Sequence, residues 1–308
     1  MQTTQTGIEM NQFDQLHRYL FDKASVRGEL VRLQDTLKPI VHSTDYPKSI
    51  QQLLAEMAAA TSLLTATLKF EGEVGLQIQS QGKVRYAVIN ATHEQTLRGV
   101  ARWDENADLS EATFSELVEN AVLVITITPT EGERYQGVVA LDKGSLAGCL
   151  EDYFERSEQL ATRVFIHTDF TVNNQPKAAG MLLQVVPQSA ESTQVTSESE
   201  FEHLCTLTET MTAEELFSLP AEDVLYRLYH EQHVQLYAPK AVAFACTCSR
   251  QRSSEALRNL DKQELLDIIK AEGAIAMNCQ YCHTEYRFDE IDVEALHSGY
   301  SQSPSTPQ

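Results

Sequence analysis

The sequence predicts an α+β protein with three parts: an N-terminal domain that mixes sheet and helix, an acidic helical linker, and a small C-terminal domain rich in cysteine. Within the first 187 residues, apolar side chains recur first at helical and then at strand spacing. After residue 187 the chain turns polar, and four of its six cysteines fall in two tight pairs beyond residue 240. Strand runs beside segregated helices are typical of α+β domains. The predicted parts are 1–187, 188–239 and 240–297, followed by a disordered tail at 298–308.

The N-terminal domain opens with two amphipathic stretches, at 13–21 and 28–37. A long helix is predicted over 47–68, because Pro47 suits a first helical turn and apolar residues follow at helical spacing. A second helix is predicted over 145–159, with Ser145 as its N-cap. Alternating patterns predict the remaining elements, which are strands at 74–79, 84–90, 122–128 and 135–141 and a hairpin of 162–170 with 179–186 around Asn173-Asn174.

The linker begins with a polar stretch at 188–199, rich in Ser, Thr, Gln and Glu. Beyond it, Thr212 and Glu215 form a capping-box pattern, and 220–230 predicts a helix with one apolar stripe. Such short helices are unstable alone, so they must dock on another part of the chain. The stripe consists of Val224, Leu225, Leu228 and Tyr229.

The C-terminal cysteines follow a metal-binding pattern. Cys246 and Cys248 are separated from Cys279 and Cys282 by thirty residues, and a predicted helix over 254–272 would fold back to bring the pairs together. Four thiolates make a tetrahedral zinc site. A domain of this size has a small core, and a zinc ion would supply much of its folding free energy. We therefore predict one Zn²⁺ per chain, bound by these four cysteines in a small C-terminal zinc-binding domain.

The cysteines alone leave open whether the zinc is purely structural or part of a redox switch. Adjacent thiols in each pair can also close into disulfides, which would remove the metal ligands. A nucleic-acid-binding ribbon is disfavoured, because residues 240–290 carry seven Lys or Arg against eight Asp or Glu. A thioredoxin-like enzyme is disfavoured because no βαβ unit follows Cys279.

Composition excludes other classes of function. The net charge of −20 argues against nucleic acid as a partner, and the sequence shows no membrane span and no signal peptide, so we expect a cytoplasmic protein. Cys149 and Cys205 lie among apolar residues and are expected to be buried in cores. His230 and His233 are expected at the surface, and His283 is not needed as a ligand. Neither a nucleotide-binding motif nor a nucleophile elbow is present, so we expect no enzyme.

Several further motifs, taken together, are specific to one protein family. Through them the chain resembles the redox-regulated heat-shock chaperonin family of thirty-three-kilodalton proteins. The resemblance extends over nearly the whole chain; Ala55 stands where a glycine is expected. The motifs are residues 14–21 (DQLHRYLF), 26–33 (VRGELVRL), 46–54, 66–72 (ATLKFEG), 134–137 (RYQG), 151–159 (EDYFERSEQ), both cysteine pairs and 286–289 (YRFD).

This resemblance implies an ATP-independent holdase. In the reduced state the four cysteines would bind zinc and the protein would be inactive. Peroxide combined with unfolding stress, or hypochlorous acid, would form the disulfides Cys246–Cys248 and Cys279–Cys282 and unfold the C-terminal domain. The linker would then lose its docking partner, and its apolar residues would hold unfolding client proteins. The family's active form is a homodimer. A constitutive zinc-ribbon interaction module and a thiol-disulfide enzyme are the competing hypotheses.

Overall fold

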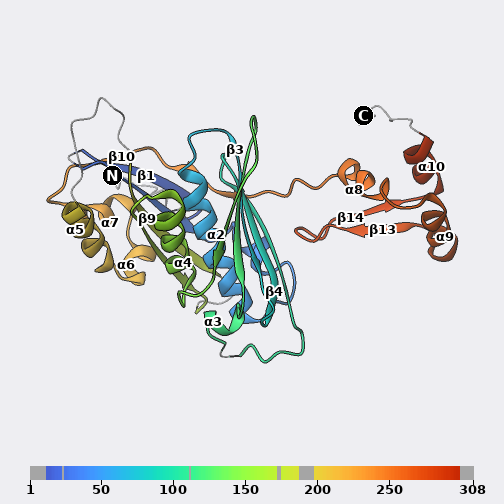
Figure 1. Ribbon diagram of the computed structural model, residues 1–308, viewed down its shortest axis with the longest axis horizontal. Coiled ribbons are helices and arrows are strands. Elements are labelled where there is room, and N and C mark those ends of the chain that lie inside the picture. The colour runs from blue at the N-terminus through green and yellow to red at the C-terminus, as the bar shows by residue number, and fades with distance from the viewer. Residues whose placement is uncertain (1–11, 23, 111, 172–174, 187–197, 299–308) are drawn as a thin grey trace, which may run out of the picture. The chain divides into compact units, whose positions relative to one another are not determined.

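The computed structural model describes residues 12–298 apart from 23, 111, 172–174 and 187–197. The chain divides into two compact units, Met1–Ala245 and Cys246–Gln308, which are described separately (Figure 1). Strands and helices are mixed in both units, which confirms the predicted α+β class. No helix among the described residues is long and apolar enough to cross a membrane.

The first sheet of the N-terminal unit, sheet A, has the strand order β10-β1-β2-β9-β8, with β11 also pairing with β1, and all its pairs are antiparallel. The two stretches that the sequence marks only as amphipathic form β1 and β2 of this sheet. The predicted hairpin is β8 with β9, and its turn at Asn173-Asn174 lies outside the described residues. The strands are β1 (Gln15–Phe21), β2 (Val26–Leu33), β8 (Thr162–Asp169), β9 (Lys177–Val185), β10 (Val234–Leu236) and β11 (Lys240–Ala241).

The second sheet, sheet B, has the order β12-β5-β4-β3-β6-β7. Its pairs are antiparallel except that β12 runs parallel to β5. Four of these strands match the predicted ones, whereas β5 and the two-residue β12 were not predicted. The strands are β3 (Gly72–Gln79), β4 (Val84–Thr92), β5 (Thr96–Trp103), β6 (Val122–Pro129), β7 (Tyr135–Ala140) and β12 (Ala243–Phe244).

The long predicted helix is α2 (Lys48–Ala66), and it contacts strands of both sheets. Every residue from Met57 to Ala66 is buried, because neither side of the helix faces water. The other predicted helix is α4 (Leu146–Tyr153), and the Ser145 side chain caps it by accepting from the Gly148 N–H. Helix α4 continues into the π-helix η1 (Phe154–Glu158). Two short helices, α1 (Lys38–Val41) and α3 (Phe114–Leu117), also contribute buried side chains to this core.

Three helices from the predicted linker cover the other face of sheet A: α5 (Glu198–Glu209), α6 (Ala213–Ser218) and α7 (Ala221–Tyr229) (Figure 1). The Thr212–Glu215 capping box is present at the start of α6, as predicted. Residues 188–197 of the predicted polar stretch lie outside the described residues. The helices and the sheet share one apolar cluster, to which the sheet contributes Tyr19, Phe21, Val26, Leu30, Ala179, Met181 and Leu183 and the helices contribute Phe201, Leu204, Cys205, Leu216, Val224, Leu225, Leu228 and Tyr229.

Residues 240–245 join the two sheets just before the first cysteine. β11 pairs with β1 of sheet A, and β12 pairs with β5 of sheet B. Between them Val242 is buried; its N–H donates to the Asp14 carbonyl (2.8 Å), and its own carbonyl accepts from Thr36 Oγ1 (3.1 Å). We predicted that the C-terminal domain begins at residue 240, but these residues belong to the N-terminal unit, and the division falls after Ala245.

The described part of the C-terminal unit, residues 246–298, contains a two-stranded sheet and three helices. The single helix predicted over 254–272 is wrong: the structure has two helices, because the Asp261 carboxylate accepts from the Gln263 and Glu264 N–H groups and starts a new helix. As a result Leu260, expected on the inner face, is 49% exposed. Gly273, with φ of +83°, ends the second helix as predicted. The elements are α8 (Arg250–Leu257), α9 (Lys262–Glu272), β13 (Ile275–Asn278), β14 (Glu285–Phe288) and α10 (Glu290–Ser298).

Candidate metal centre

Two short loops present the four C-terminal cysteines. Cys246 and Cys248 follow β12 and precede α8, whose N-cap is Ser249. Cys279 and Cys282 lie in the turn between β13 and β14. That turn is closed by two backbone hydrogen bonds: His283 N–H donates to the Cys279 carbonyl (2.8 Å), and Cys279 N–H donates to the Thr284 carbonyl (3.0 Å). The fold therefore fixes both members of this pair on one rigid turn.

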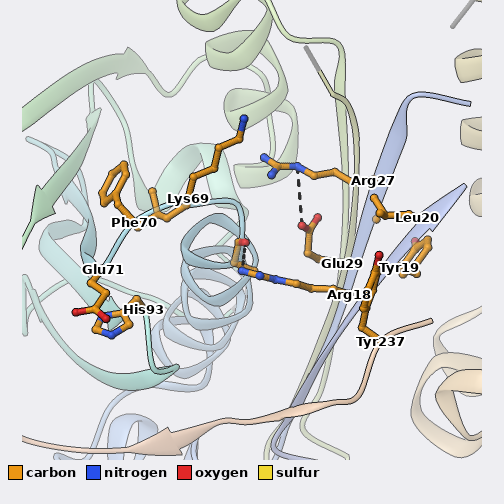
Figure 2. Close-up of a pocket in the computed structure, with 13 residues that line it drawn as sticks. Arg18, Tyr19, Leu20, Arg27, Glu29, Lys69, Phe70, Glu71, His93 and Tyr237 are labelled. Atoms are coloured by element: carbon orange, nitrogen blue, oxygen red, sulfur yellow. Dashed lines mark hydrogen bonds and ion pairs between the residues drawn. The ribbon is translucent and has the colours of Figure 1, made fainter. Parts of the chain in front are cut away.

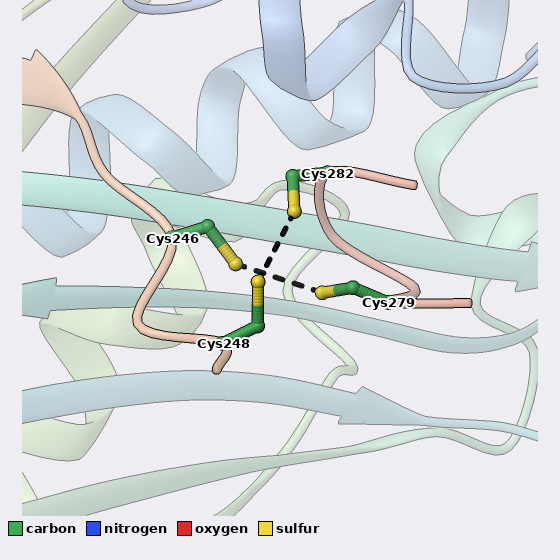
Figure 3. A group of neighbouring side chains, drawn as sticks. All are labelled: Cys246, Cys248, Cys279 and Cys282. Atoms are coloured by element: carbon green, nitrogen blue, oxygen red, sulfur yellow. Dashed lines mark hydrogen bonds between the residues drawn. The ribbon is translucent and has the colours of Figure 1, made fainter. Parts of the chain in front are cut away.

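The four sulfur atoms converge on one point (Figure 3). All lie within 4.8 Å of one another, with Cys246 Sγ 3.6 Å from Cys279 Sγ and Cys248 Sγ 3.4 Å from Cys282 Sγ. A tetrahedral site with zinc–sulfur bonds of about 2.3 Å has sulfur–sulfur edges of about 3.8 Å. The structure thus brings together all four residues that the sequence selects, at separations that fit a Cys₄ zinc site.

The pKa values of two of these thiols, Cys246 and Cys282, are shifted in opposite directions. Burial raises the pKa of Cys246 to about 12. Burial also opposes ionisation of Cys282, but hydrogen bonds from Thr284 outweigh it and bring the pKa of the Cys282 thiol to about 6. The Thr284 hydroxyl lies 3.2 Å from Cys282 Sγ. Since metal ligation requires thiolates, Cys282 is the sulfur best prepared to start it.

Two side chains that sequence reasoning did not assign support the sulfur cluster. Tyr286 Oη donates a hydrogen bond to Cys248 Sγ (3.2 Å) from the strand after the second pair. Arg250 donates to the Arg287 carbonyl (2.5 Å) and to Asp292 Oδ2 (2.6 Å), and its guanidinium lies 4.6 Å from the centre of the Phe288 ring. Arg250 thus ties α8 to β14 and α10. The run 286–289 marked this strand in the sequence, but its contact with the sulfur atoms depends on the fold.

Cys149, Cys205, His230 and His233 lie where the sequence predicted. Cys149 and Cys205 are buried in the two apolar clusters of the N-terminal unit, and burial raises the pKa of both thiols. His230, His233 and His283 are exposed, and none belongs to the four-sulfur cluster. Neither buried thiol is in a position to react readily with an oxidant in solution.

Comparison with known proteins supports one assignment. A family model described as Hsp33 protein matches residues 14–289. The 33 kDa chaperonin of Pseudoalteromonas atlantica is 61% identical over 287 residues, covering 93% of this chain and 96% of the relative. The 33 kDa chaperonin of Cronobacter sakazakii is 52% identical over 97% of this chain and 99% of its own length. The crystal structure of the heat shock protein 33 homolog from Thermotoga maritima, 23% identical, superposes with a TM-score of 0.78 over 93% of this chain and 98% of that one, which shows the shared fold. The chain belongs to the Hsp33 family.

Proposed function

We propose that this protein is a redox-regulated, ATP-independent holdase that prevents the aggregation of unfolding proteins during oxidative stress. Its relatives are named chaperonins, which supports a chaperone and not an enzyme. The observation that carries the redox part is the convergence of four sulfur atoms within 4.8 Å in a unit whose own apolar core is small. We propose a cytoplasmic location, where thiols stay reduced until an oxidant appears.

In the reduced state Cys246, Cys248, Cys279 and Cys282 would hold one zinc ion. The metal would supply the cross-link between the two loops that the apolar core is too small to supply. Tyr286, through its hydrogen bond to Cys248, orients that sulfur. In this state α5, α6 and α7 stay packed on sheet A, and the apolar cluster that they share with the sheet is closed to clients.

Oxidation would remove all four ligands. Each pair of zinc-bound thiolates would lose two electrons to the oxidant and form one disulfide, while one peroxide takes up those electrons with two protons from solvent and becomes two waters. The family resemblance implies the local pairs Cys246–Cys248 and Cys279–Cys282. The two shortest sulfur–sulfur distances instead join the two loops, but all four atoms lie within 4.8 Å, so the local pairs are also within reach. Peptide mapping by mass spectrometry of the oxidised protein would distinguish the two patterns.

Loss of the metal-held fold, together with unfolding stress, would release the linker. The side chains of α5, α6 and α7 that face sheet A, and the sheet residues that they cover, would become a large apolar surface for clients. The net charge of −20 would keep the complex soluble. We also propose that the active form is a homodimer, as the resemblance implies.

Light scattering of a heat-unfolding client tests this function. The zinc-loaded reduced chain should leave aggregation unchanged, whereas the same chain after warm peroxide treatment should suppress it. Reduction with a thiol before the assay should restore the inactive state. Equal suppression by both forms, or by neither, would contradict the switch and favour a constitutive zinc-ribbon interaction module.

A further inference from the structure

A pocket of about 600 Å³ opens on the N-terminal unit beside the C-terminal end of α2 (Figure 2). Three segments build it: the hairpin of strands β1 and β2, the end of α2 with the residues that follow it, and Tyr237, which comes directly after β10. His93, between β4 and β5, completes one rim. The pocket contains none of the four clustered cysteines, and the redox mechanism gives it no role.

Large apolar side chains gather at its mouth although water reaches them. Leu20 is 37% exposed, Phe70 is 45% exposed and Tyr237 is 42% exposed, and all three line the same pocket. They come from three different segments of the chain. Figure 2 shows Phe70 and Tyr237 on opposite sides of the Arg18 side chain. Exposed apolar groups concentrated around a concave site indicate a ligand site.

The pocket is also basic, in a chain whose net charge is −20. Arg18, Arg27 and Lys69 line it, against Glu29 and Glu71. Glu29 is buried, its Oε2 atom has no hydrogen-bond partner among the described residues, and burial raises the pKa of its carboxyl to about 7. Its Oε1 atom lies 3.9 Å from Arg27 Nε, so Glu29 pairs with one of the three cations, and the cationic side chains of the lining still outnumber the carboxyls.

Both arginines are held in place by backbone and side-chain acceptors. Arg18 Nη2 donates to the Ala66 carbonyl at the end of α2. Arg27 donates to the Thr67 carbonyl (3.2 Å) and to Gln184 Oε1 (2.5 Å). A cationic group fixed in this way loses little side-chain entropy when an anion binds.

We propose that this pocket binds a small organic anion with an aromatic ring. The carboxylate, sulfonate or phosphate of the ligand would meet Arg18 and Lys69, and its apolar part would extend past the Arg18 side chain, with Phe70 on one side and Leu20 and Tyr237 on the other. Charge-assisted hydrogen bonds fix the anionic end, and aromatic and aliphatic contacts bind the apolar end.

Such a ligand would also act on the linker, an extension that rests on the proposed function. The Tyr237 N–H donates to the Arg18 carbonyl (2.9 Å), and Tyr237 directly follows β10, which pairs with β1 after α7. A ligand in contact with both Phe70 and Tyr237 therefore binds only while the end of the linker is docked. By linkage, it would lower the undocked population by the factor 1 + [L]/Kd.

The test uses 8-anilinonaphthalene-1-sulfonate, a fluorescent aromatic anion, with the reduced zinc-loaded full chain. Wild-type protein should show one saturable site per chain. Lys69→Glu and Phe70→Ser, both at exposed positions, should each weaken binding roughly tenfold. Two control variants alter exposed side chains outside the pocket, Lys270→Glu and Val138→Ser, and should bind like wild type. Circular dichroism checks that each variant is folded.

Equal binding by the pocket variants and the controls would overturn the site, whatever the redox behaviour of the protein. Trypsin cleavage at Arg227 in α7 tests the linkage separately. With the probe at nine times the wild-type Kd, cleavage of wild type should slow about tenfold, whereas cleavage of Phe70→Ser, which binds about tenfold more weakly, should slow only about twofold. An unchanged cleavage rate at saturated binding would overturn the coupling to the linker. The chaperone assay plays no part in either measurement, so the proposed function can fail independently.

Discussion

The N-terminal unit encloses a whole helix, α2, between two six-stranded sheets, whereas the C-terminal unit has a core of five buried apolar side chains among its described residues. Those five are Leu257, Leu265, Ile275, Phe288 and Val293. In the C-terminal unit even residues at helical spacing, such as Ile268, stay more than one third exposed. Apolar burial is therefore sufficient in the first unit and insufficient in the second.

This difference indicates which part of the molecule can act as a switch. A domain with a large core tolerates the loss of one interaction, and a domain that depends on a single cross-link unfolds when that link is lost. The helices α5, α6 and α7 are intermediate: they are short, yet they bury a continuous apolar cluster against sheet A. The next four predictions test or refine this ranking.

The largest effect should follow loss of the ligands. Cys279→Ser combined with Cys282→Ser should abolish zinc retention and unfold the C-terminal unit, because structural zinc contributes roughly 10–16 kcal/mol in small zinc domains. Zinc content by atomic absorption and the signals of residues 246–298 by NMR would measure this. Thr247→Ser, in the loop between the other two ligands Cys246 and Cys248, should keep one zinc per chain. Normal zinc retention by the double variant would disprove the ligand assignment.

The next effect concerns the helices on sheet A. Leu225 and Leu228 of α7 are buried, and replacing both by Ser should cost roughly 2–5 kcal/mol for each residue. The linker would then undock without oxidant, and the reduced protein should suppress client aggregation in part. Tyr226→Ser changes a side chain that is 72% exposed on the same helix and should stay inactive. A double variant as inactive as the control would contradict the role of the linker.

The third prediction concerns how the stability of the N-terminal unit depends on pH. Burial raises the pKa of Glu29 to about 7, so this group stabilises the fold at low pH, and the contribution is lost as pH rises from its unfolded value toward 7. Glu29→Gln should therefore match wild type near pH 5 and be up to about 3 kcal/mol more stable at pH 8. Denaturant unfolding of the N-terminal unit at both pH values would measure the difference. Glu71→Gln, at an exposed position on the same pocket, should shift stability by less than about 0.5 kcal/mol at either pH.

The smallest effect should come from Tyr286→Phe. The variant keeps the ring and loses the hydrogen bond to Cys248 Sγ. Zinc affinity, measured by competition with a chromogenic chelator, should fall about tenfold, as is typical when a group that supports a ligand is removed. Unchanged affinity would show that the sulfur cluster alone fixes Cys248.

The sequence predicted those features that depend on local pattern. Helix α2, the Ser145 and Thr212 caps and the grouping of the four cysteines each follow from residues close together in the chain. The separate helix α9 was missed because apolar spacing alone does not reveal that Asp261 starts a new helix. Strand β2 pairs with β9, which is distant in sequence, and its residues are buried on both faces, so it lacks the alternation that identifies a half-exposed strand.

The features that depend on tertiary packing were not predictable. The contact of Tyr286 with Cys248 spans 38 residues, and the pocket joins residue 18 to residue 237. Such contacts follow from strand register, which one sequence does not determine. For the same reason the start of the C-terminal unit was placed at residue 240 instead of 246.

Residues 240–245 limit how far unfolding of the C-terminal unit can spread along the chain. Unfolding that begins at Cys246 must break the contacts of this stretch, here called the clasp, before it reaches α7. Val242 is buried in the core. Ala243 N–H donates to the Gln95 carbonyl (3.1 Å), and Ala245 N–H donates to the Leu97 carbonyl (3.0 Å). Under the proposed function, oxidation frees the chain only as far as this clasp, and heat or another denaturing stress must open the rest. The protein would then act as a coincidence detector: it would stay inactive under oxidation alone or denaturing stress alone and become active when both act together.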